Sequence, residues 1–283
     1  MPSSPSSSAQ AARKGVADRL RELMLDAGLN GKELAARCGW TPAKTSRIIN
    51  AKTPPSDQDI RTWCTACEAD DQADDLIAKS RQAGSMYVEW RRMERSGLRQ
   101  AQEAVRPLYE RTRHFRAYAP WVLPGIFQTR AYTTAILTAI RERRGLLDDV
   151  AAAVDERMDR QHILHDGPHR FAVLIEESTL RNGLGGRPVM LDQLRHLLAV
   201  SRLPNVSLGV LALRPDRDKA WPVEGFWIYD TTQVNVELIS GYLTITQPSE
   251  IAMYADVYAE LSAQAVHGVP ARALITAAIN ALG

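Results

Sequence analysis

The stretch LNGKELAARCGWTPAKTSRIINAK, which runs from Leu29 to Lys52, decides the fold of the N-terminal part of the chain. Asn30 precedes a short amphipathic segment, and asparagine is a favoured residue immediately before a helix. Gly39 supplies a tight turn, and Pro42 suits the first position of the helix that follows it. The stretch therefore predicts two short helices joined by a turn, over about 31–37 and 42–50.

Apolar residues at helical spacing predict three further helices around this pair. One covers 16–27 and ends at Gly28, one covers 57–68 and is opened by Ser56, and one begins near Asp71. The sequence thus indicates an all-α, five-helix domain of the helix-turn-helix type over residues 15–80. The Ser/Pro-rich segment before it, residues 1–14, has the composition of a disordered tail.

The charge of the Leu29–Lys52 stretch indicates a nucleic-acid partner. Between Asn30 and Lys52 there are five basic residues and one acidic residue, a local net charge of +4. In a helix-turn-helix domain, the second helix enters the major groove of double-stranded DNA and its N-terminal half contacts base edges. The alternative is a generic helical hairpin with a solvated basic face.

Helical geometry places Ala43, Lys44 and Arg47 on one face of the second helix. Lys44 is the best candidate for reading guanine, and Ala43 can contact a thymine methyl group. Other polar residues of the stretch can position the protein on the phosphates without reading sequence. The full set of expected DNA-binding residues is Lys32, Thr41, Ala43, Lys44, Thr45, Ser46, Arg47, Asn50 and Lys52.

The same stretch resembles the helix-turn-helix of the Xre (Cro-like) family of regulators. The matching positions are Leu34, Ala35, Gly39, Thr41, Ser46, Arg47, Ile48, Asn50 and Lys52. Three positions depart from the pattern. Gly31 replaces the glutamine that opens the first of the two helices in many members. At the end of the second helix, Ile49 replaces an acidic residue and Ala51 replaces a glycine. The resemblance implies DNA binding, and we expect a homodimer because small helix-turn-helix modules commonly gain affinity by pairing.

The composition predicts a two-domain cytoplasmic protein. The chain has 283 residues, of which 45% are hydrophobic and 24% are charged. No apolar run approaches the roughly 18 residues of a membrane span, and the N-terminus lacks the apolar segment of a secretory signal. An odd number of cysteines, three, favours a reducing compartment over a disulfide framework.

The second half, residues 81–283, alternates helical and β-prone segments and predicts a larger α+β domain with a mixed or antiparallel sheet. Twelve arginines and five glutamates between Gly84 and Gly145 give that stretch a local net charge of +7, which solvated helix faces would explain. The expected helices cover 85–95, 98–113, 128–143, 147–165, 188–202, 248–265 and 269–282. The expected strands cover 170–176, 206–213, 225–229, 234–239 and 242–246, the last three forming an antiparallel meander.

Several blocks of this half resemble actinobacterial regulators grouped with WhiJ, in which an Xre module precedes a long C-terminal domain. They include WVLPGIFQTRAYTTAIL (121–137), VDERMDRQHIL (154–164) and LIEESTLRNGLGGRPVMLDQLRHLL (174–198). The resemblance implies a developmental or antibiotic-related regulator. It also implies an antitoxin-like arrangement with a small partner protein encoded nearby.

Four residues of this half are candidates for binding a partner or ligand. Trp121 and Phe127 flank an aromatic Pro-Gly loop, which is either core packing or the wall of a groove. Glu176 and Glu177 are paired carboxylates at the end of a strand, a pattern that can serve acid/base chemistry. No nucleophile elbow, Walker loop or HExxH motif accompanies them, so we expect no enzyme and no catalytic residues.

Two metal-like patterns have simpler explanations. Cys64 and Cys67 form a CxxC on an amphipathic helix, where two small buried thiols are favoured over a zinc or redox site. His162, His165 and His169 lie near a helix end, where surface histidines are favoured by the helix dipole. We expect no metal and no cofactor.

These observations predict a sequence-specific DNA-binding transcription regulator whose C-terminal domain mediates dimerisation and senses a partner or ligand. The first alternative is an antitoxin-like interaction protein whose C-terminal domain binds a small partner protein. The second is an enzyme that carries a DNA-binding module.

Overall fold

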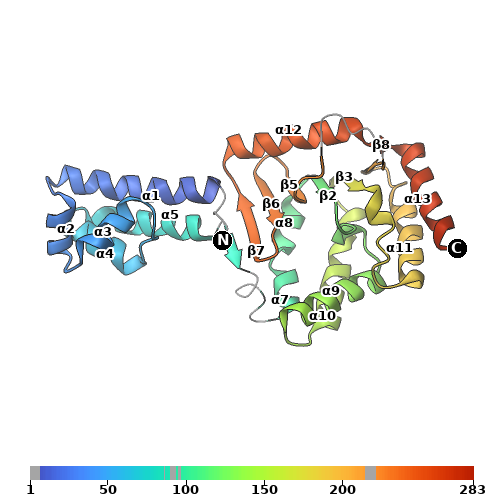
Figure 1. Cartoon of the computed structure of the whole chain (residues 1–283), viewed down its shortest axis with the longest axis horizontal. Helices are drawn as coiled ribbons and strands as arrows, with labels where there is room; N and C mark the ends of the chain where they lie inside the picture. The colour runs from blue at the N-terminus through green and yellow to red at the C-terminus, as the bar shows by residue number, and fades with distance from the viewer. Residues whose placement is uncertain (1–6, 86, 90–93, 95–96, 214–220) are drawn as a thin grey trace. The chain divides into compact units, whose positions relative to one another are not determined.

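A computed structural model of the chain describes residues 7–85, 87–89, 94, 97–213 and 221–283. The chain forms two compact units (Figure 1). The first contains Met1–Val88 and Leu243–Ile245, and the second contains Glu89–Tyr242 and Thr246–Gly283. The boundary lies after α5, whereas the sequence placed it at residue 80, inside that helix.

The helices of the first unit confirm the predicted all-α module. In chain order they are α1 (Ser7–Asp26), α2 (Gly31–Arg37), α3 (Pro42–Ile49), α4 (Asp57–Ala66), the short 3-10 helix η1 (Asp70–Gln72) and α5 (Ala73–Ser85). The helix α1 begins at Ser7 and not at Val16, so the predicted disordered tail is wrong for residues 7–14. Residues 1–6 of that predicted tail lie outside the described residues.

The indole of Trp63 anchors the core of this module. Trp63 is fully buried, and its Nε1 donates a hydrogen bond of 2.9 Å to the main-chain carbonyl of Leu20. This bond ties α4 to α1 and satisfies the single polar atom of a large buried side chain. The ring of Trp40, in the turn between α2 and α3, lies 6.1 Å from that of Trp63.

The second unit is built on a mixed sheet in which the strands follow the order β6-β5-β2-β3-β4-β8. The strands β2, β3 and β4 are parallel, while β5 pairs antiparallel with both β2 and β6. The mixed sheet and the α+β class are therefore as predicted. The strands of this unit are β2 (His114–Ala119), β3 (Arg170–Glu176), β4 (Val206–Leu211), β5 (Phe226–Tyr229), β6 (Gln233–Glu237) and β8 (Val266–His267). Two further strands, β1 (Tyr87–Glu89) and β7 (Gly241–Ile245), each contain residues assigned to the first unit.

Helices cover both faces of this sheet because its central strands are buried on both sides. Phe115, Phe171 and Val173 point into a core that also contains Leu194 of α11 and Ile275 of α13. The helix α12 lies on the opposite face, where Tyr254 packs against Phe226 with ring centroids 5.0 Å apart. The helices are α7 (Leu98–Glu103), α8 (Arg106–Arg111), α9 (Arg130–Arg144), α10 (Val150–Asp159), α11 (Arg187–Val200), α12 (Pro248–Gln264) and α13 (Gly268–Leu282).

Three sequence expectations for this unit are wrong. The segment 85–95 contains β1 rather than a continuous helix, and residues 86, 90–93 and 95 lie outside the described residues. The expected helix over 98–113 is divided between α7 and α8. The central strand β2 was missed, since the segment HFRAYA carries an arginine and two alanines and does not have the β-branched composition of a typical strand.

The main-chain conformation of Ala51 gives a stability prediction. Ala51, directly after the C-cap of α3, has a φ of 51°, a left-handed conformation that costs an L-residue about 1–2 kcal/mol. Ala51→Gly removes this strain but adds flexibility to the unfolded chain. We expect a net stabilisation of the module by about 1 kcal/mol.

Amide hydrogen exchange of α3 and α4 in the full chain measures this change. Gly39→Ala is the matched control, since Gly39 has a φ of 68° and an added Cβ would meet no atom within 4 Å. It should destabilise the module by a similar amount. Weaker protection in Ala51→Gly would contradict the prediction.

Candidate nucleic-acid interface

The α2–α3 segment has the local geometry of a helix-turn-helix. The Asn30 side chain accepts hydrogen bonds from the amides of Lys32 and Glu33, and the Glu33 carboxylate accepts one from the Asn30 amide at 2.8 Å. This reciprocal arrangement is a capping box, which fixes where α2 begins. Gly39 has a φ of 68°, a conformation that glycine adopts without strain, and so allows the turn between the helices.

The helix α3 has two distinct sides. Thr45 and Ile48 are buried at 1% and 2% exposure and fix the inner side. Ala43, Ser46, Arg47 and Asn50 are exposed and follow the i, i+3, i+4, i+7 spacing of one helical face. We call these four residues the α3 face. The predicted Ala43, Ser46, Arg47 and Asn50 are thus brought together.

Lys44 is not part of the α3 face. Its Nζ lies 2.5 Å from Asp59 Oδ1 and 4.1 Å from the centroid of the Trp40 ring. The side chain is half-buried, and the ion pair joins α3 to α4. In the free protein Lys44 therefore holds the helices together and is not presented to base edges. The pattern alone does not reveal this role, because Asp59 lies in α4, outside the Leu29–Lys52 stretch.

The prediction that Thr45 contacts DNA is wrong. The sequence placed it among the DNA-binding residues, but only 1% of it is exposed, so it cannot reach a phosphate while the module is folded. Among the described residues its Oγ1 has no hydrogen-bond partner. Its β-branched body packs inward, and its methyl group lies 3.9 Å from where a Cβ on Gly31 would be.

The remaining predicted contacts lie around the α3 face. Lys32, at the start of α2, and Lys52, after α3, are exposed. Thr41 occupies the N-cap position of α3, but its side chain does not accept a capping hydrogen bond. Asn50 Nδ2 donates to the Ser46 carbonyl at 2.8 Å, which steadies the end of the helix. Within the described part of the chain, neither Lys32, Arg47 nor Lys52 forms an ion pair.

The CxxC cysteines belong to the core of the first unit. Cys64 is fully buried and Cys67 is 7% exposed. Burial raises the pKa of the Cys67 thiol to about 11, so it stays protonated and unreactive at neutral pH. This agrees with the expected structural role.

The three histidines do not converge. His162 and His165 are exposed, as expected, but His169 is buried, which corrects its assignment to the surface. His169 Nδ1 lies 2.7 Å from the Thr112 carbonyl, so its ring joins β3 to the segment before β2. Within the described residues no cluster of three or more potential metal ligands is found.

The four residues predicted to bind a partner or ligand differ in their exposure. Phe127 is fully buried in the core, whereas Trp121 is 68% exposed. Glu176 and Glu177 are buried. Tyr118 Oη donates to Glu176 at 2.5 Å, and Glu177 accepts bonds from Arg181 and from the Leu213 amide. Both carboxylates therefore have structural partners, and Phe127 is part of the packing.

Comparison with known proteins finds two family matches, in separate parts of the chain. The family described as "Helix-turn-helix domain" matches residues 16–76. The family described as "Domain of unknown function (DUF5753)" matches residues 103–277, which is more than half of the chain. The chain belongs to the DUF5753 family. Within this family member, the helix-turn-helix match covers the α1–α5 module and the DUF5753 match covers most of the second unit.

Other comparisons with this DUF5753 chain are remote. No curated protein matches it. A solved structure of TrmBL2, an archaeal chromatin protein described as showing a novel mode of DNA binding, is 11% identical in sequence with a TM-score of 0.31. The aligned region covers 84% of this chain and 87% of the TrmBL2 chain, but a likeness at this level carries no argument. Among the described helices, none has the length and hydropathy needed to cross a membrane.

The contact between Lys44 and Asp59 gives a titration prediction. Partial burial alone would raise the pKa of the Asp59 carboxyl. Hydrogen bonds from Lys44 and Ser56, together with the Lys44 charge, outweigh it and lower that pKa below its ordinary value. The pair therefore stabilises the module at neutral pH, and this contribution is lost as the pH falls through the lowered pKa of Asp59.

Lys44→Met should raise the pKa of Asp59, as followed by NMR titration of its carboxyl carbon. Lys32→Met, which removes an exposed lysine of the same module, is the control and should leave Asp59 unchanged. An Asp59 titration that is the same in wild type and Lys44→Met would show that Lys44 is free in solution.

Proposed function

We propose that this chain is a sequence-specific DNA-binding transcription regulator whose helix α3 enters the major groove. The observation that carries the proposal is the α3 face. It is exposed, lies on the second helix of a helix-turn-helix and carries Arg47 without an acidic partner among the described residues. An α-helix fits the major groove, and an unpaired arginine can donate to guanine or to phosphate.

Each residue of the α3 face has a role in this proposal. Arg47 supplies the charged contact, and Ala43 is small enough to approach a thymine methyl group. Ser46 and Asn50 donate or accept hydrogen bonds at the groove edge. Lys32 and Lys52 contact the phosphates on either side, which positions the protein without reading sequence. Lys44 supports the face from within, through Asp59 and Trp40.

The second unit would supply dimerisation and the regulatory input, as the resemblance to WhiJ-like regulators implies. Trp121 and Trp221 are exposed at 68% and 72%, and large exposed aromatic side chains are typical of protein contact sites. This observation favours a partner protein, in the antitoxin-like manner, as the second candidate function. The family resemblance and the Xre-like α3 favour a homodimer on a two-fold symmetric operator.

We expect this chain to act by binding and not by catalysis. The paired carboxylates that were its best catalytic candidates, Glu176 and Glu177, accept hydrogen bonds from Tyr118, Arg181 and the Leu213 amide. We also expect it to work in the cytoplasm, where its cysteines Cys38, Cys64 and Cys67 stay reduced.

Fluorescence anisotropy with the DNA upstream of the protein's own gene tests the proposal. Arg47→Ala should weaken binding by about tenfold or more, since a base or phosphate contact of arginine contributes about 1–3 kcal/mol. It should also reduce the preference over random DNA or the steepness of the salt dependence.

Arg61→Ala is the matched control, because Arg61 is an exposed arginine of α4 outside the helix-turn-helix and is paired with Asp74. It should change the affinity by less than about twofold, as expected for an exposed ion pair. Equal losses in the two variants would mean that the α3 face does not read DNA.

A further inference from the structure

A cavity of about 940 Å³ lies in the second unit at the amino ends of β2, β3 and β4. Arg116, Ala172 and Ser207 line it, and they are paired across the three strands. Ala172 and Ser207 have small side chains, which leaves the sheet face hollow here. Its volume falls in the range of small-molecule sites, about 300–1,000 Å³.

The lining of this cavity is rich in positive charge. Arg116 extends from β2, and Arg170, which is paired with His114 in the register, extends from β3. Within the described residues, neither Arg116 nor Arg170 forms an ion pair with a carboxylate. Cationic side chains gathered on adjacent strands repel one another unless an anion compensates them.

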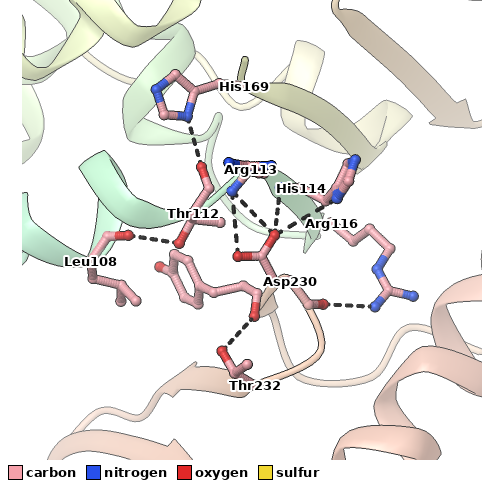
Figure 2. A network of polar contacts seen from close by, with 9 residues as sticks. Leu108, Thr112, Arg113, His114, Arg116, His169, Asp230 and Thr232 are labelled. Atoms are coloured by element: carbon pink, nitrogen blue, oxygen red, sulfur yellow. Dashed lines mark hydrogen bonds and ion pairs between the residues drawn. The ribbon is translucent and has the colours of Figure 1, made fainter. Parts of the chain in front are cut away.

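Asp230 is the one acidic residue among the described residues of the lining, and it lies close to the main chain of β2 and 3.8 Å from His114 Nδ1. Its carboxylate accepts hydrogen bonds from the amides of Arg113 at 3.1 Å and His114 at 2.8 Å (Figure 2). Its main-chain carbonyl accepts a bond of 3.0 Å from Arg116, which orients the guanidinium. Asp230 has a φ of 52°, a conformation that aspartate tolerates better than most residues.

The hydrogen bonds of Asp230 therefore hold the β5–β6 turn against the start of β2. This wall of the cavity is formed without a ligand. The lining also includes Pro204 and Ala172, which offer apolar surface beside the charges. A cavity of this size, with two arginines and apolar walls, suits an anion that carries an organic part and exceeds what a bare inorganic ion would need.

We propose that this cavity binds a small organic anion, whose phosphate or carboxylate group lies between Arg116 and Arg170. The organic part lies over Pro204 and Ala172, and Ser207 is placed to donate a hydrogen bond. Arginine suits both anionic groups because its planar fork donates two parallel hydrogen bonds. The site is an effector site in the second unit, and it does not rest on the proposed reading of DNA by α3.

Isothermal titration calorimetry of the full chain tests this with three probes of similar size: phenyl phosphate, phenylacetate and benzyl alcohol. At least one of the two anions should bind saturably, and benzyl alcohol, which lacks the charge, at least about tenfold more weakly. Preference for phenyl phosphate assigns the ligand to the phosphate class, and preference for phenylacetate assigns it to the carboxylate class.

Arg116→Gln and Arg170→Gln should each weaken binding of the preferred anion by about tenfold, the usual effect of removing one charge-assisted hydrogen bond. Arg170 is exposed, so its replacement separates loss of the ligand from loss of the fold. Arg195→Gln, at an exposed arginine of α11, is the matched control and should leave binding unchanged.

Two outcomes would overturn the proposal. One is that neither anion binds, or that both bind equally to wild type and Arg170→Gln. The other is that a 20-base-pair duplex, and neither small anion, binds in a way that depends on Arg116 and Arg170, which would make the cavity a contact for the DNA backbone. Whether α3 reads DNA is tested separately, by the effect of Arg47→Ala on DNA binding.

Discussion

The burial of Thr45 and Ile48 beneath α3 is the constraint on which the N-terminal module depends. With these two side chains fixed inward, the helical period leaves Ala43, Ser46, Arg47 and Asn50 outward. Trp63 holds the helices beneath them through its bond to Leu20, and Lys44 joins α3 to α4 through Asp59. The surface offered to DNA is thus a consequence of core packing, and the charge on it comes from Arg47.

In the second unit, the register of the strands, rather than the helical period, determines which side chains lie together on the surface. The parallel register of β2, β3 and β4 sets His114 beside Arg170 and Arg116 beside Ala172. Asp230 then fixes the neighbouring turn by accepting main-chain amides rather than by neutralising the arginines (Figure 2). A basic, hollow surface results at one end of the strands, and its charge is left for an external anion to compensate.

The helix-turn-helix could be predicted because its signals are local. Asn30, Gly39 and Pro42 each act on the main chain next to them, and all three positions agree with the structure. The strand β3 was predicted with its observed bounds because it is a continuous apolar run. The features that the sequence did not predict depend on residues far apart in the chain. Lys44 is held by Asp59 of α4, and β2 is a strand because β3 and β5 pair with it. The cavity, too, joins residues from four separate segments.

Hydrogen–deuterium exchange of the full chain, with and without the upstream DNA at saturating concentration, tests the central claim most directly. If α3 enters the major groove, DNA should slow exchange in peptides from 29–52, and the core of the second unit around β3 should not change. Binding of DNA with no protection in 29–52, or with protection confined to the second unit, would contradict the assignment of α3 as the DNA-reading helix.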